Sequence, residues 1–338
     1  MTARRALVLP APLLLALGGC ERWPAALDPH SPEASSIASL IGGFVALLGA
    51  IWLAVVVASL LAIRRGRADA ASAEPQSYDA AAERRRTAWV SVLTVATAVV
   101  VLVLTGFSYA TQRVLFGPRQ EGLTILATGH QWWWELRYED ADPSRIVETA
   151  NEIHVPVDVP VTLKLESSDV IHSLWIPSLM GKIDLIPGRQ NYLRFKAAAP
   201  GVYRGQCAEF CGVQHAHMGL LVVAEPVEDF ERWRDAQRRT AVEPSDPERQ
   251  AGHDAFLKRP CVMCHAIRGA GAGGRSGPDL THVGGRRTIG AGTLPATRGA
   301  LAAWIVDPHG VKPGVDMPMV KLDPDELNSI SAYLESLK

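Results

Sequence analysis

Two long stretches of the chain consist of apolar and uncharged polar residues. They span residues 37–63 and 87–112, and neither contains a charged side chain. Each exceeds the roughly 20 residues that a helix needs to cross the hydrocarbon core of a membrane. A buried helix of a soluble protein rarely continues this far without one charged face. The pattern therefore predicts a hairpin of two transmembrane helices.

The loop that joins these stretches carries arginines at both ends: Arg64, Arg65, Arg67, Arg84, Arg85 and Arg86. Positive residues next to membrane helices mark the cytoplasmic side. The loop is therefore predicted to lie in the cytoplasm, and everything after Arg113 is predicted to lie outside.

The N-terminal segment has the features of an export signal. Arg4 and Arg5 precede an apolar stretch, residues 6–17, and the sequence Leu-Gly-Gly-Cys ends at Cys20. This ending resembles the bacterial lipoprotein cleavage box, which implies cleavage after residue 19 and acylation of the Cys20 thiol. An ordinary signal peptide, or a buried cysteine in an uncleaved one, stays open as an alternative.

After the second apolar stretch the pattern becomes that of short strands. Val161, Leu163 and Leu165 alternate with polar side chains, as in a strand with one buried face. Residues 191–196 alternate similarly, and residues 219–224 form a compact apolar run. Prolines separate these segments. The pattern predicts a β-sandwich of about 100 residues.

A polar connector, residues 236–249, leads to a C-terminal segment of helices and glycine-rich loops. Asp323 is placed to cap the last helix, and Pro324 occupies its first turn. An apolar stripe follows at helical spacing: Leu327, Ile330, Leu334 and Leu337. Residues 250–338 are therefore predicted to form a small all-α domain.

Composition narrows the range of functions. The chain has 34 basic and 35 acidic residues, so its charge gives no indication of a nucleic-acid partner. Its cysteines are one lone residue near the start and two close pairs, which is not the framework of a disulfide-rich protein. This distribution indicates one processing site and two cofactor sites.

The first cysteine pair lies within a set of soft metal ligands. Cys207, Cys211, His215 and Met218 fall within twelve residues, and thiolates, imidazole and thioether together suit copper. A single-copper electron-transfer site uses one cysteine, so the second thiolate favours a site with two metal ions. Zinc or a disulfide stays open, although zinc does not select methionine and a disulfide leaves the histidine unexplained.

This segment resembles the copper-A loop of cytochrome c oxidase subunit II. Residues 129–132, 168–173 and 184–189 resemble three further segments of that family, and with the hairpin the resemblance covers residues 37–235. It implies a cupredoxin-like β-sandwich. It also implies a set of copper ligands: His172, Cys207, Glu209, Cys211, His215 and Met218.

The resemblance assigns a role to each of these residues. The two cysteines would bridge both coppers, each histidine would bind one, and Met218 would be a weak axial ligand. Glu209 would bind through its backbone carbonyl, and its carboxylate would reach a magnesium ion shared with subunit I. Trp132 matches the aromatic residue through which the family takes electrons from cytochrome c. His154 and His217 are expected to be ordinary surface or hydrogen-bonded histidines.

One position departs from the family pattern. The family commonly has a carboxylate three residues before the tryptophan that opens the second membrane helix, and this carboxylate is associated with proton uptake. Here that position, before Trp89, is Arg86, and the nearest acid is Glu83. No proton-uptake residue is therefore assigned.

The second cysteine pair forms a haem attachment signature. Cys261 and Cys264 are spaced to bond the two vinyl groups, and His265 follows at once as an iron ligand. A zinc knuckle is disfavoured because no second pair of ligands stands at zinc spacing.

The surrounding 90 or so residues resemble a class I cytochrome c. The resemblance implies that residues 277–280 pack against the proximal histidine and that Met317 is the distal ligand, with Met319 as its rival. His282 and His309 are expected at the surface.

The combined resemblance implies subunit II of a caa-type cytochrome c oxidase with a fused cytochrome. Electrons would pass from haem c to the copper pair and then to subunit I, where oxygen is reduced to water and protons are pumped. Expected partners are subunit I, subunit III, an external cytochrome c and the bacterial plasma membrane, with both redox domains on the periplasmic or extracellular side. Two alternatives stay open: a copper-A nitric oxide reductase, and a membrane-anchored electron carrier without a catalytic partner.

The predicted organisation is multidomain. It comprises a signal peptide (1–19), an N-terminal segment with the hairpin (20–112), a cupredoxin-like copper domain (113–235), a linker (236–249) and an all-α class I cytochrome c domain (250–338).

Overall fold

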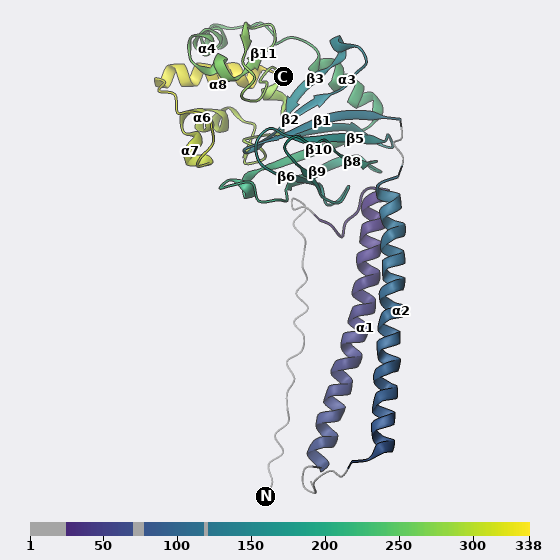
Figure 1. The fold of residues 1–338 in the computed structure, drawn as a ribbon. Coiled ribbons are helices and arrows are strands. Elements are labelled where there is room, and N and C mark those ends of the chain that lie inside the picture. Colours follow the sequence, from purple (N-terminus) through teal and green to yellow (C-terminus); the bar gives the residue numbers. More distant parts are fainter. Residues whose placement is uncertain (1–24, 70–77, 118–120) are drawn as a thin grey trace, which may run out of the picture.

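The computed structural model describes residues 25–69, 78–117 and 121–338. Helices α1 (Pro32–Asp69) and α2 (Ala80–Leu115) run side by side as a long hairpin (Figure 1). Each is long and apolar enough to cross a membrane. Both contain the predicted apolar stretches and continue into the polar residues on either side.

The polar start of α2 has a local cause. The Asp79 carboxylate accepts a hydrogen bond from the backbone N–H of Ala81 at 2.8 Å, which satisfies one of the free donors of the first turn. The helix therefore begins in the predicted cytoplasmic loop rather than at the first apolar residue. The predicted signal peptide and Cys20 lie outside the described residues.

Beyond α2 the chain forms a β-sandwich, which confirms the prediction. Its strands are β1 (Leu123–His130), β2 (Trp133–Tyr138), β3 (Val147–Ala150), β4 (Glu152–Pro156), β5 (Val161–Ser167), β6 (His172–Trp175), β7 (Ile183–Leu185), β8 (Asn191–Phe195), β9 (Gly201–Cys207) and β10 (Gly219–Glu225). One sheet has the order β3-β2-β1-β5-β8, and the other has the order β4-β10-β9-β6-β7. β1 is parallel to β5, and β4 is parallel to β10.

The core of the sandwich lies between the two sheets. Trp134, Leu163 and Leu165 are fully buried in it. The alternation predicted for β5 is less strict than expected, because Thr162 is buried as well. Helix α3 (Val227–Gln237) follows the last strand and adds Phe230 to the same core.

The C-terminal domain is mainly helical, as predicted. Its helices are α4 (Pro247–Lys258), α5 (Cys261–Cys264), α6 (Arg298–Val306), α7 (Pro308–Val311) and α8 (Pro324–Ser336). Two short ladders pair β11 (Ala266–Ile267) with β12 (Ala272–Gly273) and β13 (Thr288–Ile289) with β14 (Leu294–Pro295). Because α3 ends at Gln237 and α4 begins at Pro247, the non-helical connection between the domains is residues 238–246.

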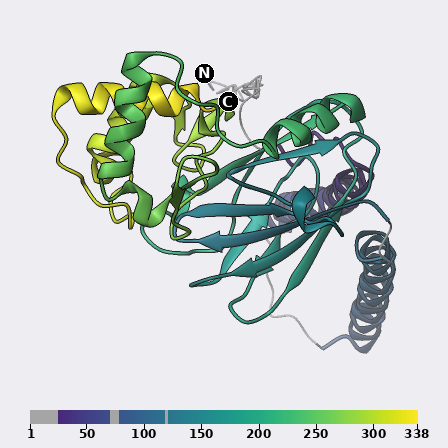
Figure 2. The ribbon, with the colours of Figure 1, turned by 90° about the horizontal axis from the view of Figure 1, so that it is seen from above.

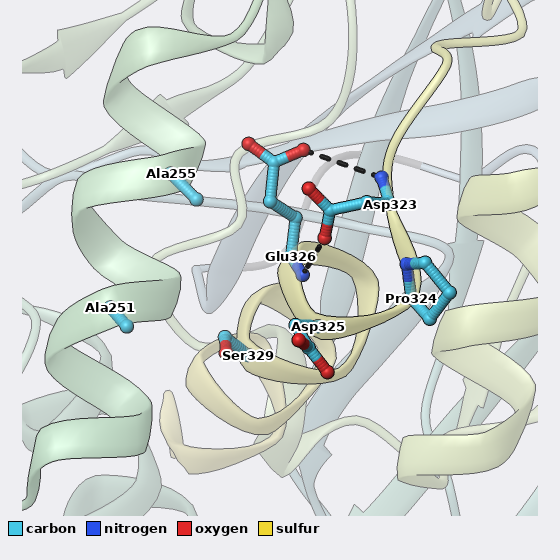
Figure 3. Close-up of a pocket in the computed structure, with 7 residues that line it drawn as sticks. All are labelled: Ala251, Ala255, Asp323, Pro324, Asp325, Glu326 and Ser329. Carbon is cyan, nitrogen blue, oxygen red and sulfur yellow. Dashed lines mark hydrogen bonds between the residues drawn. The ribbon is translucent and has the colours of Figure 1, made fainter.

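Helix α8 begins as the sequence predicts. The Asp323 carboxylate accepts the backbone N–H of Glu326 at 2.9 Å, and the Glu326 carboxylate accepts the backbone N–H of Asp323 at 3.4 Å (Figure 3). This reciprocal pair is a capping box. Ile330 and Leu334 of the predicted stripe are buried in the core of the domain.

His282 is buried rather than at the surface, where the sequence places it. Its side chain is 6% exposed. The cause is the fold of the chain around it, because its ring nitrogens lie 3.1 Å from the carbonyl of Lys338 and 3.2 Å from the carbonyl of Arg239. Backbone acceptors from two distant segments thus replace water.

The helical domain lies beside one end of the sandwich, as Figures 1 and 2 both show. The backbone N–H of Gly219, at the start of β10, donates to the carbonyl of Ala291 at 2.9 Å. The backbone N–H of Arg287 donates to the Glu152 carboxylate at 2.9 Å. The two domains are therefore in direct contact through polar groups of β4 and β10.

Candidate copper and haem centres

Three segments of the sandwich bring the predicted copper ligands together. His172 begins β6, Cys207 ends β9, and the loop after β9 carries Cys211, His215 and Met218 before β10 starts. β6 and β9 are paired, with Leu174 opposite Cys207. The pairing places the histidine, distant in sequence, beside the cysteine loop.

The donor atoms form a compact chain. The Cys207 Sγ lies 3.9 Å from the His172 Nδ1 and 3.7 Å from the Cys211 Sγ. The Cys211 Sγ lies 3.6 Å from the His215 Nδ1 and 3.9 Å from the Met218 Sδ. Each cysteine sulfur thus has one imidazole beside it, and the two thiols lie between His172 and His215.

The Cys207 and Cys211 side chains are buried free thiols. Their separation of 3.7 Å is far from the roughly 2.05 Å of a disulfide bond. The ligand atoms of His172, Cys207 and Cys211 lie within 4.8 Å of one another, so one ion can contact all three. Thiolates, imidazoles and a buried thioether suit copper better than zinc, and the donor set fits the copper centre that the sequence indicates.

Electrostatics favour the binding of a cation at the thiols. A hydrogen bond from the Cys211 thiol lowers the pKa of Cys207 despite its burial. The Cys207 thiolate in turn raises the pKa of Cys211. One thiol therefore ionises readily, and the second needs a metal cation to balance its charge.

Asp169 orients His172, and sequence reasoning did not assign it this role. Its carboxylate accepts the Nε2–H of His172 at 2.7 Å, which leaves the Nδ1 lone pair facing Cys207. Burial raises the pKa of Asp169, but hydrogen bonds with His172 and with the backbone N–H groups of Val170 and Gln131 outweigh it and lower the pKa. The available signal was the Asp-x-x-His spacing in one loop.

The turn between β1 and β2 holds the cysteine loop from the other side. The side-chain amide of Gln131 and the indole N–H of Trp132 donate to the carbonyl of Cys211 at 2.7 Å and 2.8 Å. The resemblance makes Trp132 the residue that receives electrons from cytochrome c. One hydrogen bond therefore joins this residue to Cys211, a predicted copper ligand. Its side chain is only 7% exposed. Trp134 is fully buried, as expected for a packing residue.

The backbone carbonyl and the side-chain carboxylate of Glu209 have different surroundings. Its backbone carbonyl oxygen lies 3.2 Å from the Cys207 Sγ, close to where the resemblance implies a copper ligand. Its carboxylate is about half exposed and lies 3.8 Å from the Nζ of Lys182. In the described part of the chain this carboxylate is at the surface, away from the thiols.

His154 is a hydrogen-bonded histidine, as expected. Its ring lies between the carboxylates of Glu152 and Glu225, with N···O distances of 3.0 Å and 2.9 Å. Trp233 stacks on the ring at a centroid distance of 4.1 Å. Burial lowers the pKa of His154, but the two carboxylates more than compensate and raise it.

The predicted haem attachment residues lie on and just after the short helix α5. The Nδ1 of His265 lies 2.8 Å from the carbonyl of Pro278, and since a carbonyl only accepts, Nδ1 carries the proton. The Nε2 is then free to bind iron, and burial lowers the pKa of the ring, which favours the neutral form. Gly277 passes so close that an added Cβ would lie 2.7 Å from the His265 ring. The loop over the histidine therefore requires glycine.

The two candidate distal methionines differ in exposure. Met317 is partly buried and packs against the core of the helical domain. Met319 is 62% exposed. A ligand to a buried iron must point inward, so this placement favours Met317.

Arg86 lies on the first turns of α2, where its guanidinium is 3.8 Å from the Glu83 carboxylate. Arg86 occupies the position where the family commonly has the proton-uptake carboxylate. Glu83, the acid nearest to that position, thus forms an ion pair with Arg86.

Comparison with known proteins gives two family matches. The family described as cytochrome c oxidase subunit II, periplasmic domain, matches residues 140–225, and the cytochrome c family matches residues 250–338.

Curated relatives extend the similarity over nearly the whole chain. Cytochrome c oxidase subunit 2 of Alkalihalophilus pseudofirmus is 33% identical over 334 residues, which cover 96% of this chain and 95% of the relative. The protein of the same name from Bacillus subtilis is 32% identical over 65% of this chain and 63% of its own. Among solved structures, the periplasmic domain of subunit II of cytochrome oxidase from Bradyrhizobium japonicum is 34% identical and covers 35% of this chain and 96% of its own, with a TM-score of 0.33.

Proposed function

Because the chain belongs to the cytochrome c oxidase subunit II family, in the form fused to a cytochrome c, we propose that it carries electrons from its own haem to its copper centre and on to subunit I. One observation supports this most: a buried pair of thiols with a histidine beside each sulfur lies in a domain that directly contacts the haem-binding domain. In this proposal the chain supplies electrons, and subunit I reduces oxygen.

The proposed copper centre holds two ions. Cys207 and Cys211 would bridge them, and His172 and His215 would each bind one. Met218 and the carbonyl of Glu209 would be weak ligands to the ions, in keeping with the positions of the Met218 Sδ beside Cys211 and of the Glu209 carbonyl beside Cys207. When bound, such a pair accepts and releases one electron. The chain's own task is to hold the ligands rigidly, which lowers the cost of each change of charge.

The proposed haem is bound covalently through Cys261 and Cys264. The Nε2 of His265 and the sulfur of Met317 would ligate the iron, a combination that raises the reduction potential. The carbonyl of Pro278 holds the imidazole in the tautomer that this ligation requires.

The proposed setting is the bacterial plasma membrane, with both helices spanning it and the redox domains on the periplasmic or outer side. Subunit I would contact the copper domain, and the exposed carboxylate of Glu209 is available for a magnesium ion at that boundary. Subunit III and an external cytochrome c are further proposed partners, and Cys20 is the proposed lipid attachment site.

Purification of the chain from its native membrane in mild detergent tests this function. We expect a complex with a membrane subunit that contains haem and consumes oxygen when the fused cytochrome is reduced. The pairing of Arg86 with Glu83, at the position of the family's proton-uptake acid, is the one observation that favours a nitric oxide reductase. A complex that consumes nitric oxide and not oxygen would contradict the oxidase assignment, and a chain that purifies alone would indicate a free electron carrier.

A further inference from the structure

Lys312 is an unusual lysine. It follows α7 in the helical domain, and its side chain is 2% exposed. A buried ammonium group is costly unless hydrogen bonds or opposite charges surround it. The Nζ of Lys312 donates hydrogen bonds to three backbone carbonyls: those of Trp132 at 2.8 Å, His217 at 2.9 Å and Gly290 at 3.2 Å.

These three carbonyls belong to three separate parts of the molecule. Trp132 lies in the turn between β1 and β2, His217 lies in the cysteine loop, and Gly290 lies in the helical domain itself. One side chain thus ties the haem-binding domain to the two segments that enclose the thiols. No motif in the sequence marks this lysine.

The residues next to Lys312 continue the same contact. The side-chain amide of Gln214 donates to the carbonyl of Pro313 at 2.8 Å. Gly314 has a φ of +89°, and an added Cβ would lie 3.2 Å from the side chain of Val213 and 3.7 Å from the Trp132 ring. Val315 packs against the core of the sandwich. Residues 312–315 therefore lie beside Trp132 and, together with the cysteine loop, contribute to its low exposure.

We propose that Lys312 is a positioning residue that fixes the fused cytochrome against the turn between β1 and β2 and against the cysteine loop, so that the rate of electron transfer from haem c to the copper domain depends on this one side chain. This inference rests on the proposed function.

The test uses the complete oxidase complex with Lys312→Met, which keeps the length of the side chain and removes its donors. Lys321→Met, at an exposed lysine of the same domain, is the matched control. We expect Lys312→Met to slow electron transfer from haem c to copper by about tenfold or more, since small misplacements of reacting groups cost large factors in rate. We expect the variant to match the parent in its haem absorption spectrum and in the electron paramagnetic resonance spectrum of its copper. The KM for a soluble cytochrome c is also expected to match, while kcat falls.

Hydroxyl-radical labelling gives a readout that does not depend on activity. In the parent complex Trp132 is expected to be protected relative to the partly exposed Trp233. In Lys312→Met the labelling of Trp132 is expected to rise severalfold, and in Lys321→Met it is expected to stay at the parent level.

Two outcomes would overturn the proposal. One is a Lys312→Met complex that transfers electrons at the parent rate with Trp132 still protected. The other is rapid labelling of Trp132 in the parent, a measurement that stands even if the variant fails to fold. A parent complex without copper or without any transfer from haem would instead count against the proposed function.

Discussion

The nitrogen of His172 that faces the thiols is selected by a carboxylate on the opposite side of the ring. Asp169 accepts the Nε2–H, and the backbone N–H of Gln131 holds Asp169 in turn at 2.6 Å. The cysteine loop alone indicates copper from its residue types, but His172 lies 35 residues before Cys207 and needed a family resemblance to be found. For Asp169 the only signal is the Asp-x-x-His spacing, which is weak because the role of the carboxylate depends on how its loop folds back.

Replacing Asp169 by asparagine tests its role directly. We expect Asp169→Asn to weaken copper binding by about 10-fold to 100-fold, because the orienting partner of a metal-bound histidine becomes neutral. A competition titration with a copper chelator measures the change. Asp235→Asn, at an exposed carboxylate on α3, is the control. Equal affinities in the two variants would show that Asp169 does not orient the ligand.

His154 gives the copper domain a pH-dependent contribution to stability. Its pKa is raised in the folded protein, so the charged ring stabilises the fold fully below its unfolded pKa, about 6.5, and this contribution is lost as the pH rises through the folded pKa. We therefore expect the parent to melt at a higher temperature than His154→Gln in mild acid, with a difference that shrinks at alkaline pH. Melting curves over a pH series measure it, with His309→Gln as control. A difference that grows with pH would contradict the assignment.

At the scale of elements, sequence patterns predicted helices and strands correctly where neighbouring residues in the chain determine the structure. The capping residues of α8 and the apolar stretches of α1 and α2 were all predictable from spacing and composition. The burial of Thr162 on β5 was not, because it depends on what covers the second face of the strand. The same holds for His282, whose environment comes from the C-terminal residue and the connection between the domains.

Removal of the α8 cap tests the clearest of these signals. Asp323→Ala deletes the acceptor for the N–H of Glu326 and is expected to cost about 1 kcal/mol of unfolding free energy. Denaturant unfolding followed by haem absorbance measures the loss. Asp325→Ala, in the same first turn, removes only a charge near the helix start and is expected to cost less. Equal losses in both variants would argue against the capping role.

At the scale of the whole molecule, the sequence predicts both redox domains but not their docking. The contact depends on single polar groups from distant segments, such as Lys312 on the carbonyl of Trp132 and Arg287 on the Glu152 carboxylate. Neither pair has a sequence signature. The resemblance presents Trp132 as the residue through which electrons arrive from cytochrome c, and in the structure this residue is 7% exposed and lies beside Gly314 of the helical domain.

The electron paramagnetic resonance spectrum of the oxidised, copper-loaded full chain tests the central claim most directly. We predict a hyperfine pattern from one unpaired electron shared equally by two coppers, and we predict that Cys211→Ser abolishes it. A single-copper pattern, or a folded chain that takes up no copper, would contradict the account and leave a membrane-bound cytochrome with an unexplained pair of buried thiols.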